Sequence, residues 1–270
     1  MFQSPGEIAF TIGHLDIYYY GIIMAFAIFC GLLTILGIRK YFFPDILKDR
    51  IFDISFILII CGILGARLYY VLLDYKYFLK FPYEIPAVWH GGISIQGAIA
   101  AGIIAGIIYV KKHKINFFRY ADLFIFGLVT GQIIGRWGNF FNGEAFGRVV
   151  SLEFLQNLHL PQFIINGMYI DGLYREPTFL YESIFSIIGF ILLIIVRKNK
   201  KLKLGQLTGI YLIWYGLERL IIEIFRSDSL MLGTIKIAQL VSLIAIVSGI
   251  VLLIKAIKNK KNYHEVKIFN

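Results

Sequence analysis

The run Gly135-Arg136-Trp137-Gly138-Asn139-Phe140-Phe141-Asn142-Gly143-Glu144 closes a stretch of sequence that is otherwise apolar enough to lie in a membrane. A guanidinium group held in hydrocarbon costs several kcal/mol or more, so such a residue usually faces an interior cavity and has a function there. Three glycines and two amides in the same run indicate a backbone that opens to receive a polar group. Because the run carries an arginine, we expect that group to be anionic.

The composition excludes a soluble globular protein, since 58% of the residues are hydrophobic and the mean hydropathy is +0.73. Stretches of roughly 18 to 25 apolar residues recur, and each is long enough to cross a bilayer as a helix. The sequence therefore predicts an all-α polytopic membrane protein, with one seven-helix membrane domain over residues 1–270. The predicted spans are residues 17–38, 53–73, 92–110, 121–138, 178–196, 205–225 and 236–257.

The net charge of +10 is distributed unevenly along the chain. Eighteen basic residues fall in the links after spans one, three and five and in the C-terminal tail, against six in the links on the other side. By the positive-inside rule this alternation places the N-terminus outside and the C-terminus in the cytoplasm. Topology and anionic membrane lipid explain the charge, and no nucleic-acid partner is expected.

Several common sites are missing from the sequence. Cys30 and Cys61 lie deep within predicted spans without metal-ligand spacing, and we interpret both as small packing residues. There is no phosphate-binding Walker loop, no H-E-x-x-H motif and no nucleophile elbow. The first residues also lack the basic segment and cleavage site of a removable signal peptide. We expect no cofactor and no metal.

Three arginines lie inside predicted spans: Arg67, Arg136 and Arg219. At about 1.5 Å per residue, all three stand about 21 to 22 Å above the cytoplasmic boundary, in the outer-leaflet half. Polar residues near the starts of the odd-numbered spans, namely Tyr20, Gln96 and Glu182, reach the same level. The sequence thus predicts a polar chamber accessible from the outer leaflet.

Other interpretations of each residue stay open at this point. A single arginine can snorkel to the headgroups. Arg219 and Glu223 stand four apart on one helix face, which predicts an ion pair between them, whereas Glu218 projects about 100° away toward another helix. Between spans four and five, residues 139–177 predict a small external cap with a little β structure. Asn166-Gly167, flanked by apolar residues, predicts a tight hairpin turn there.

The spacing of these polar residues resembles the signature of the bacterial prolipoprotein diacylglyceryl transferase family. The resemblance extends over essentially the full length of the chain. The matching motifs are Gly135-Arg136-x-Gly138-Asn139-Phe140-x-Asn142-x-Glu144-x-x-Gly147, Tyr20-Gly21, Gly65-x-Arg67-x-x-Tyr70, Trp89-x-Gly91-Gly92, Pro177-Thr178-x-Leu180-Tyr181-Glu182 and Tyr215-Gly216-x-x-Arg219-x-x-x-Glu223-x-x-Arg226.

The resemblance implies an enzyme of the bacterial cell membrane whose active site faces the outer leaflet. It would transfer the diacylglyceryl group of phosphatidylglycerol to the lipobox cysteine of a prolipoprotein signal peptide, the first step of lipoprotein maturation. A thioether forms and glycerol phosphate leaves. The implied catalytic residues are Arg136, Arg219, Asn139, Glu144 and Glu223, and the implied phosphatidylglycerol-binding residues are Arg136, Arg219, Asn142, Tyr20 and Arg67.

The chain departs from part of the family at the position of the proposed base for the thiol. Some members carry a histidine where this chain has Gln96, and many carry one where it has Glu176. His90 and His14 are weak candidates, and lowering of the thiol pKa by the arginines is an alternative, so the base stays unassigned. A transporter for an anion also uses buried arginines, but it predicts a midplane site and two related halves, neither of which the sequence shows.

Overall fold

The computed structural model describes residues 8–13, 15–88, 91–199, 201–227, 231–232 and 235–258. All seven predicted spans are helical: α1 (Tyr19–Phe42), α2 (Lys48–Leu73), α4 (Ile95–Lys112), α5 (Phe117–Asn142), α8 (Thr178–Arg197), α9 (Gln206–Phe225) and α10 (Ile237–Lys258). Three short helical segments, α3 (Tyr75–Lys80), α6 (Leu152–Asn157) and α7 (Gln162–Gly167), and a 3₁₀ turn over Pro82–Glu84 complete the helical part.

Within these described ranges, six helices are long and apolar enough to cross a membrane. They are α1, α2, α4, α5, α8 and α10, which confirms the polytopic all-α class. Helix α9 has the required length but carries Glu218, Arg219 and Glu223, and it is absent from that group. A count of seven spans therefore stays a prediction.

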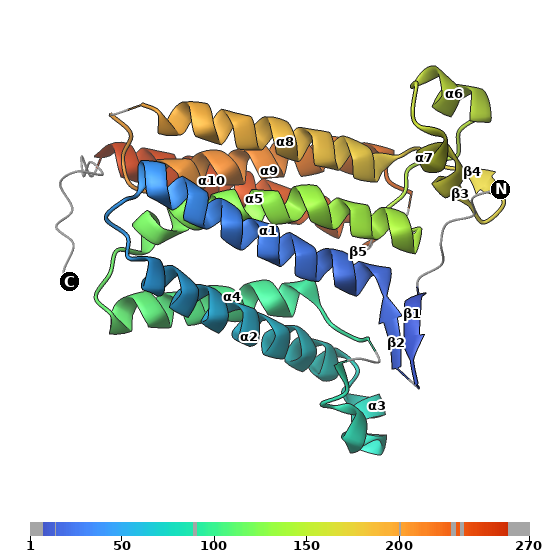
Figure 1. The fold of residues 1–270 in the computed structure, drawn as a ribbon, viewed down its shortest axis with the longest axis horizontal. Helices are drawn as coiled ribbons and strands as arrows, with labels where there is room; N and C mark the ends of the chain where they lie inside the picture. Colours follow the sequence, from blue (N-terminus) through green and yellow to red (C-terminus); the bar gives the residue numbers. More distant parts are fainter. Residues whose placement is uncertain are drawn as a thin grey trace. The chain divides into compact units, whose positions relative to one another are not determined.

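Contacts divide the described chain into two compact units, one formed by its residues up to 38 and from 121 onward and the other by residues 39–120. In the first unit α8, α9 and α10 run side by side, and α1 lies along α5 (Figure 1). The approach of α1 to α5 is close because Gly31 and Gly127 face each other: a Cβ on Gly31 would lie 2.8 Å from the Gly127 carbonyl oxygen. In the second unit α2 and α4 pack together, and α3 follows α2.

In the part of the chain that the structure describes, the strands form three two-stranded antiparallel hairpins. They pair β1 (Ile8–Ile12) with β2 (Leu15–Tyr18), β3 (Tyr169–Ile170) with β4 (Leu173–Tyr174), and β5 (Met231–Leu232) with β6 (Ile235–Lys236). The predicted cap thus contains a little β structure, together with α6 and α7. Figure 1 shows this segment beyond the end of α5 and the start of α8.

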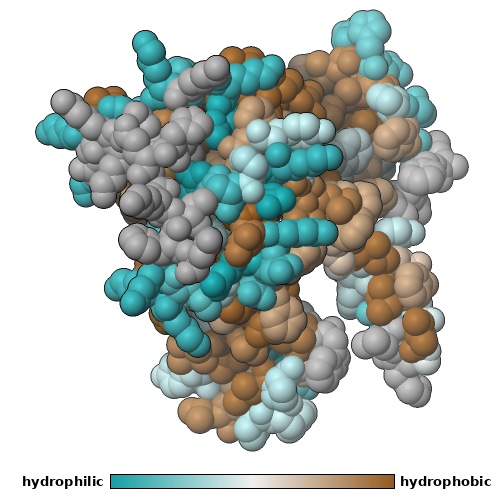
Figure 2. All heavy atoms as spheres, turned by 60° about the vertical axis from the view of Figure 1, so that its left-hand side comes forward, coloured by the Kyte–Doolittle hydropathy of each residue, from teal (hydrophilic) through white to brown (hydrophobic). Residues whose placement is uncertain are grey.

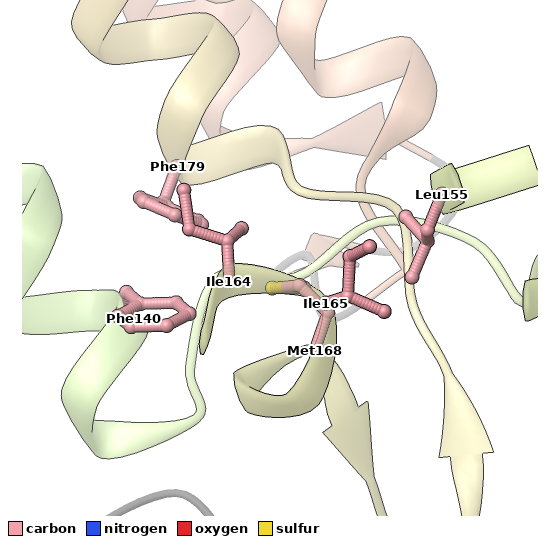
Figure 3. Close-up of a cluster of buried hydrophobic side chains, with 6 residues drawn as sticks. All are labelled: Phe140, Leu155, Ile164, Ile165, Met168 and Phe179. Atoms are coloured by element: carbon pink, nitrogen blue, oxygen red, sulfur yellow. The ribbon is translucent and has the colours of Figure 1, made fainter. Parts of the chain in front are cut away.

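The cap has a hydrophobic core of its own, which ties it to α5 and α8. Leu155 of α6, Ile164 and Ile165 of α7, and Met168 pack with Phe140 of α5 and Phe179 of α8 (Figure 3). All six side chains are almost fully buried. The end of α5 that carries the quoted run is therefore held from the cap side by apolar packing.

The predicted turn at Asn166-Gly167 is wrong. Both residues belong to α7, and the hairpin turns instead at Asp171 and Gly172, whose φ angles are 53° and 78°. Asp-Gly is also a strong hairpin signal, because both central residues of the favoured turn need positive φ. Gly167 is needed for space, since a Cβ there would lie 2.4 Å from the Phe140 ring.

Helix α9 begins against a buried carboxylate of α5. Asp122 is fully buried and accepts hydrogen bonds from the Gly205 amide (2.7 Å), the Thr208 amide (2.8 Å) and the Thr208 hydroxyl (2.6 Å). The first amides of a helix have no partner within the helix and need one from outside. Asp122 supplies it from a neighbouring helix, and so fixes where α9 starts relative to α5.

We predict that Asp122→Ala destabilises the protein by about 1–3 kcal/mol, because it leaves buried donors without an acceptor. The measurement is thermal unfolding of the purified protein in detergent, followed by tryptophan fluorescence. Thr208→Val, which removes one of the three donors, should cause a smaller loss of stability. Asp49→Asn, at an exposed position of α2, serves as the control. An unchanged unfolding temperature in Asp122→Ala would show that the hydrogen bonds from Gly205 and Thr208 to Asp122 contribute no stability.

Candidate active site

Five charged side chains of the first unit form one cluster, with Glu182 at its centre. Arg136 comes from the last turns of α5, Glu182 from the start of α8, and Glu218, Arg219 and Glu223 from α9. The Glu182 carboxylate lies between the two arginines: its Oε2 is 3.0 Å from Arg136 Nη1, and its Oε1 accepts a hydrogen bond of 2.5 Å from Arg219 Nη1. Glu182 therefore links three helices.

The predicted ion pair within α9 is present. Arg219 Nη2 lies 2.9 Å from Glu223 Oε2, four residues along the same helix face. The predicted projection of Glu218 toward another helix is also present, because Ser186 on α8 donates a hydrogen bond of 3.2 Å to Glu218 Oε1. Arg219 thus contacts two carboxylates, and Glu218 is held by a hydroxyl group.

The two arginines are more exposed to solvent than the carboxylates that they contact. The side chains of Arg136 and Arg219 are 20% and 14% exposed, whereas those of Glu182 and Glu223 are each 1% exposed. Glu182 Oε2 and Glu223 Oε2 lie near arginine nitrogens without an aligned hydrogen bond, and Glu223 Oε1 is buried with no hydrogen-bond partner among the described residues. An incoming anion would therefore meet guanidinium donors first, with the carboxylates behind them.

The quoted run forms the end of α5, and the helix continues through it to Asn142. The expectation that its glycines open the backbone is thus wrong for Gly135 and Gly138, and the chain turns only at Gly143, where φ is 62°. Gly138 makes room for a side chain instead: a Cβ there would lie 2.9 Å from the Tyr20 ring. Tyr20 also lies within the electrostatic reach of Arg136 and Glu144.

The polar residues after Arg136 surround the end of α5. The Glu144 amide donates a hydrogen bond of 2.9 Å to the Asn139 carbonyl, which folds the chain back over the helix end. The Glu144 side chain is exposed. Asn142 Oδ1 is buried with no hydrogen-bond partner among the described residues, so this oxygen is an unsatisfied acceptor.

Arg67 belongs to the second unit, where backbone carbonyls surround its guanidinium. It donates to the carbonyls of Glu84 (2.5 Å), Ile85 (2.9 Å), Gly91 (2.6 Å) and Gly92 (2.8 Å). These bonds tie the segment before α4 to α2. Arg67 also lines a pocket of about 260 Å³ with Tyr70, Asp74, Tyr77, Phe78, Glu84, Gly91 and Gly92. Its predicted contact with lipid stays a prediction.

Two of the positions considered for a base have other partners. Glu176 is 3% exposed and accepts a hydrogen bond of 2.9 Å from Arg148 Nε, so it is part of an ion pair. Gln96 is exposed at the start of α4, where its Oε1 accepts from the Ser94 hydroxyl (2.5 Å). His14, Trp89 and His90 lie outside the described residues.

The central role of Glu182 was not predicted from the sequence. Its position predicted a residue at the level of the chamber, but Glu182 was not among the predicted site residues. The available signal was the pattern Pro177-Thr178-Phe179-Leu180-Tyr181-Glu182, which sets a carboxylate in the second turn of an apolar helix. A charge at that depth needs a partner of opposite sign, and two arginines were the candidates.

Comparison with known proteins decides the family. A model of the prolipoprotein diacylglyceryl transferase family matches residues 7–255. The chain belongs to this family. The phosphatidylglycerol–prolipoprotein diacylglyceryl transferase of Staphylococcus haemolyticus is 48% identical over 247 residues, which cover 91% of this chain and 86% of the relative.

Two further relatives of the same name agree. The protein of Staphylococcus saprophyticus is 46% identical over 249 residues, or 92% of this chain and 88% of that one. The protein of Staphylococcus aureus strain MSSA476 is 44% identical over 255 residues, or 94% and 90%. The resemblance found in the motifs is confirmed, and the chain is a membrane-embedded transferase of lipoprotein biosynthesis.

We predict that Glu182→Gln lowers transfer by at least about 100-fold and destabilises the first unit by about 3–5 kcal/mol. Removal of one partner from a buried ion pair leaves the other charges uncompensated, and here two arginines lose the anion between them. Product formation and thermal unfolding would both be measured. Glu176→Gln is the matched control with a smaller expected effect, because its partner Arg148 is 63% exposed and screened by water. Equal effects of the two substitutions would contradict the central role of Glu182.

Proposed function

We propose that this chain moves the diacylglyceryl group of phosphatidylglycerol onto the thiol of a prolipoprotein lipobox cysteine, and that the cluster of Arg136, Glu182 and Arg219 is where the reaction occurs. The observation that carries the proposal is the arrangement of two arginines around one buried carboxylate. Each arginine keeps an exposed face, which is suited to a phosphate diester. Phosphatidylglycerol and prolipoprotein are the substrates in the names of the relatives.

The reaction assigns a task to each arginine. The thiolate attacks the glycerol carbon that bears the phosphate ester, a carbon–sulfur bond forms, and the carbon–oxygen bond breaks with its electron pair on the phosphate oxygen. Arg136 holds the phosphate, and Arg219 stabilises the charge that grows on the leaving glycerol phosphate. The planar guanidinium never loses its charge and offers paired donors. Preorganised donors of this kind contribute about 2.7–4 kcal/mol each to the transition state.

The remaining site residues place these groups. Glu182 and Glu223 fix the two guanidinium groups from the buried side. The Asn142 Oδ1 atom is free to accept from a hydroxyl of the glycerol headgroup, and Asn139 and Glu144 shape the turn that follows α5. Tyr20 packs beside Gly138 and contacts lipid or peptide. Arg67 holds the segment before α4 by hydrogen bonds to its backbone carbonyls. Through this segment, Arg67 contributes to binding the lipid.

The ends of the helices support the proposed orientation. Basic residues occupy the last turn of α1 (Arg39, Lys40), α4 (Lys111, Lys112), α8 (Arg197) and α10 (Lys255, Lys258). The last turns of α2, α5 and α9 have none. Hydrophilic side chains gather on the face that Figure 2 brings forward, where α8 and α10 end. With those ends in the cytoplasm, the end of α5 with Arg136 lies in the outer leaflet, and the protein forms one seven-span domain.

The activity is tested with purified protein, phosphatidylglycerol vesicles and a lipobox peptide, and the peptide is then weighed by mass spectrometry. We expect the mass of one diacylglyceryl group to be added, and none on a peptide with cysteine replaced by alanine. Absence of the added mass with folded protein would overturn the proposed function.

In the same assay we predict that Arg136→Ala and Arg136→Lys each lower transfer by at least about 100-fold, the loss expected for one oxyanion donor, while membrane insertion persists. Lysine keeps the charge but loses the planar pair of donors. Arg175→Lys, on the cap side, is the control with expected wild-type rates. Wild-type rates in Arg136→Lys would remove the argument for a paired-donor contact.

The orientation is tested with single cysteines in a Cys30→Ala, Cys61→Ala background. We expect a membrane-impermeant maleimide to label Glu153→Cys in the cap of intact cells and to leave Lys198→Cys, after α8, unlabelled until the cells are opened. Both positions are exposed. The reverse pattern would invert the topology.

A further inference from the structure

One buried carboxylate of the cluster has no arginine partner. Glu218 is 5% exposed, and none of the ion pairs found among the described residues includes it. Its hydrogen bond from Ser186 is with a neutral hydroxyl group. Glu182 and Glu223, in contrast, both contact arginines. Glu218 is therefore the one carboxylate of this cluster to which the proposed binding of the phosphate by Arg136 and Arg219 gives no role.

Glu218 borders a small cavity between α5, α8 and α9. The cavity has a volume of about 10 Å³, and its lining includes Gln132, Ser186, Tyr211 and Glu218. A space of this size accommodates about one water molecule when two to four polar partners are present. Glu218, Ser186, Gln132 and Tyr211 are such partners, and Gln132 Nε2 donates to the Tyr211 hydroxyl at 2.9 Å.

The charges around Glu218 make it the best-placed proton acceptor of the cluster. Arg136 from α5, Glu182 from α8 and Arg219 on its own helix all act on it electrostatically. Tyr211 and Tyr215 stand on the same helix, and α10 presents Ser242 and Ile246 toward Gly216. With all side chains ionised, the site holds two arginines and three glutamates, and an anionic lipid adds another negative charge. Transfer of one proton to the site reduces this excess of negative charge.

We infer that Glu218 accepts the proton of the substrate thiol, through a water held in the adjoining cavity. This inference rests on the proposed function. The S–H bond breaks, its proton goes to the Glu218 carboxylate, and the electron pair stays on sulfur, which then forms the carbon–sulfur bond. As the carbon–oxygen bond breaks, Glu218 returns the proton to the departing phosphate. No external acid or base is consumed, and the carboxylate is regenerated.

This assignment provides a base for the substrate thiol, which neither Gln96 nor Glu176 provides. A glutamine has no useful basicity, and Glu176 is paired with Arg148. A thiol with a pKa near 8.5 is mostly protonated at neutral pH, so a positioned base accelerates the step by about 10²- to 10⁴-fold. Glu218 combines burial, the absence of a fixed cation and a polar cavity beside it.

The experiment compares wild type and Glu218→Gln on two lipobox peptides, one with cysteine and one with selenocysteine, whose selenol is already ionised at neutral pH. We expect Glu218→Gln to lose at least about 100-fold on the cysteine peptide and to stay within about threefold of wild type on the selenocysteine peptide. The loss on the cysteine peptide should shrink as the pH rises toward the pKa of the thiol. An equal loss on both peptides, or no loss on either, would overturn the inference.

Two controls keep the outcome decisive. Wild type must add the diacylglyceryl mass to the cysteine peptide, so failure of the proposed function is seen separately from failure of Glu218→Gln to behave as expected. Glu153→Gln, exposed on α6, should match wild type on both peptides. If Glu218→Gln does not fold, Glu218→Asp replaces it: a base moved back by one methylene should still slow the cysteine peptide more than the selenocysteine peptide, and equal slowing would overturn the inference.

Discussion

The contact of Glu182 with Arg136 and Arg219 is the interaction on which the rest of the site depends. Its two carboxylate oxygens each face a guanidinium from a different helix, so α5, α8 and α9 meet at one buried residue. Without such an anion, each arginine would destabilise the apolar bundle by several kcal/mol, because its buried charge would be unpaired. The same carboxylate holds two like charges close together.

Helix α9 can hold three charged residues because neighbouring elements form hydrogen bonds with its backbone at both ends and pack closely against it between them. Asp122 of α5 accepts from its first amides, and Lys236 donates to the Glu223 and Arg226 carbonyls at its end. Between these ends, Gly209 and Gly216 let α10 approach closely. A helix fixed at both ends holds its charged groups at set positions, and preorganisation of this kind is what electrostatic catalysis uses.

The sequence predicted the fold better than it predicted the contacts, for physical reasons that differ from residue to residue. The spans follow from hydropathy, because hydrocarbon requires long apolar helices. The Arg219–Glu223 pair follows from helical spacing. Glu182 required knowledge of which helices are neighbours, and spacing along one chain does not contain it. The turn was misplaced because Asn166-Gly167 and Asp171-Gly172 give equal local signals, and tertiary packing on Phe140 decided between them.

Arg67 shows why a rare buried charge does not by itself define its role. Its depth in the sequence matched that of Arg136 and Arg219, yet four of its donors serve backbone carbonyls of the segment before α4. An arginine that satisfies carbonyls keeps its full positive charge, because no carboxylate neutralises it, so it still attracts anions at longer range. The arginines thus fall into two groups: Arg136 and Arg219 contact carboxylates that compensate their charges, whereas Arg67 donates to backbone carbonyls and has a charge that no side-chain ion pair of the described residues offsets. An anion that took over these Arg67 donors would displace hydrogen bonds that tie the segment before α4 to α2.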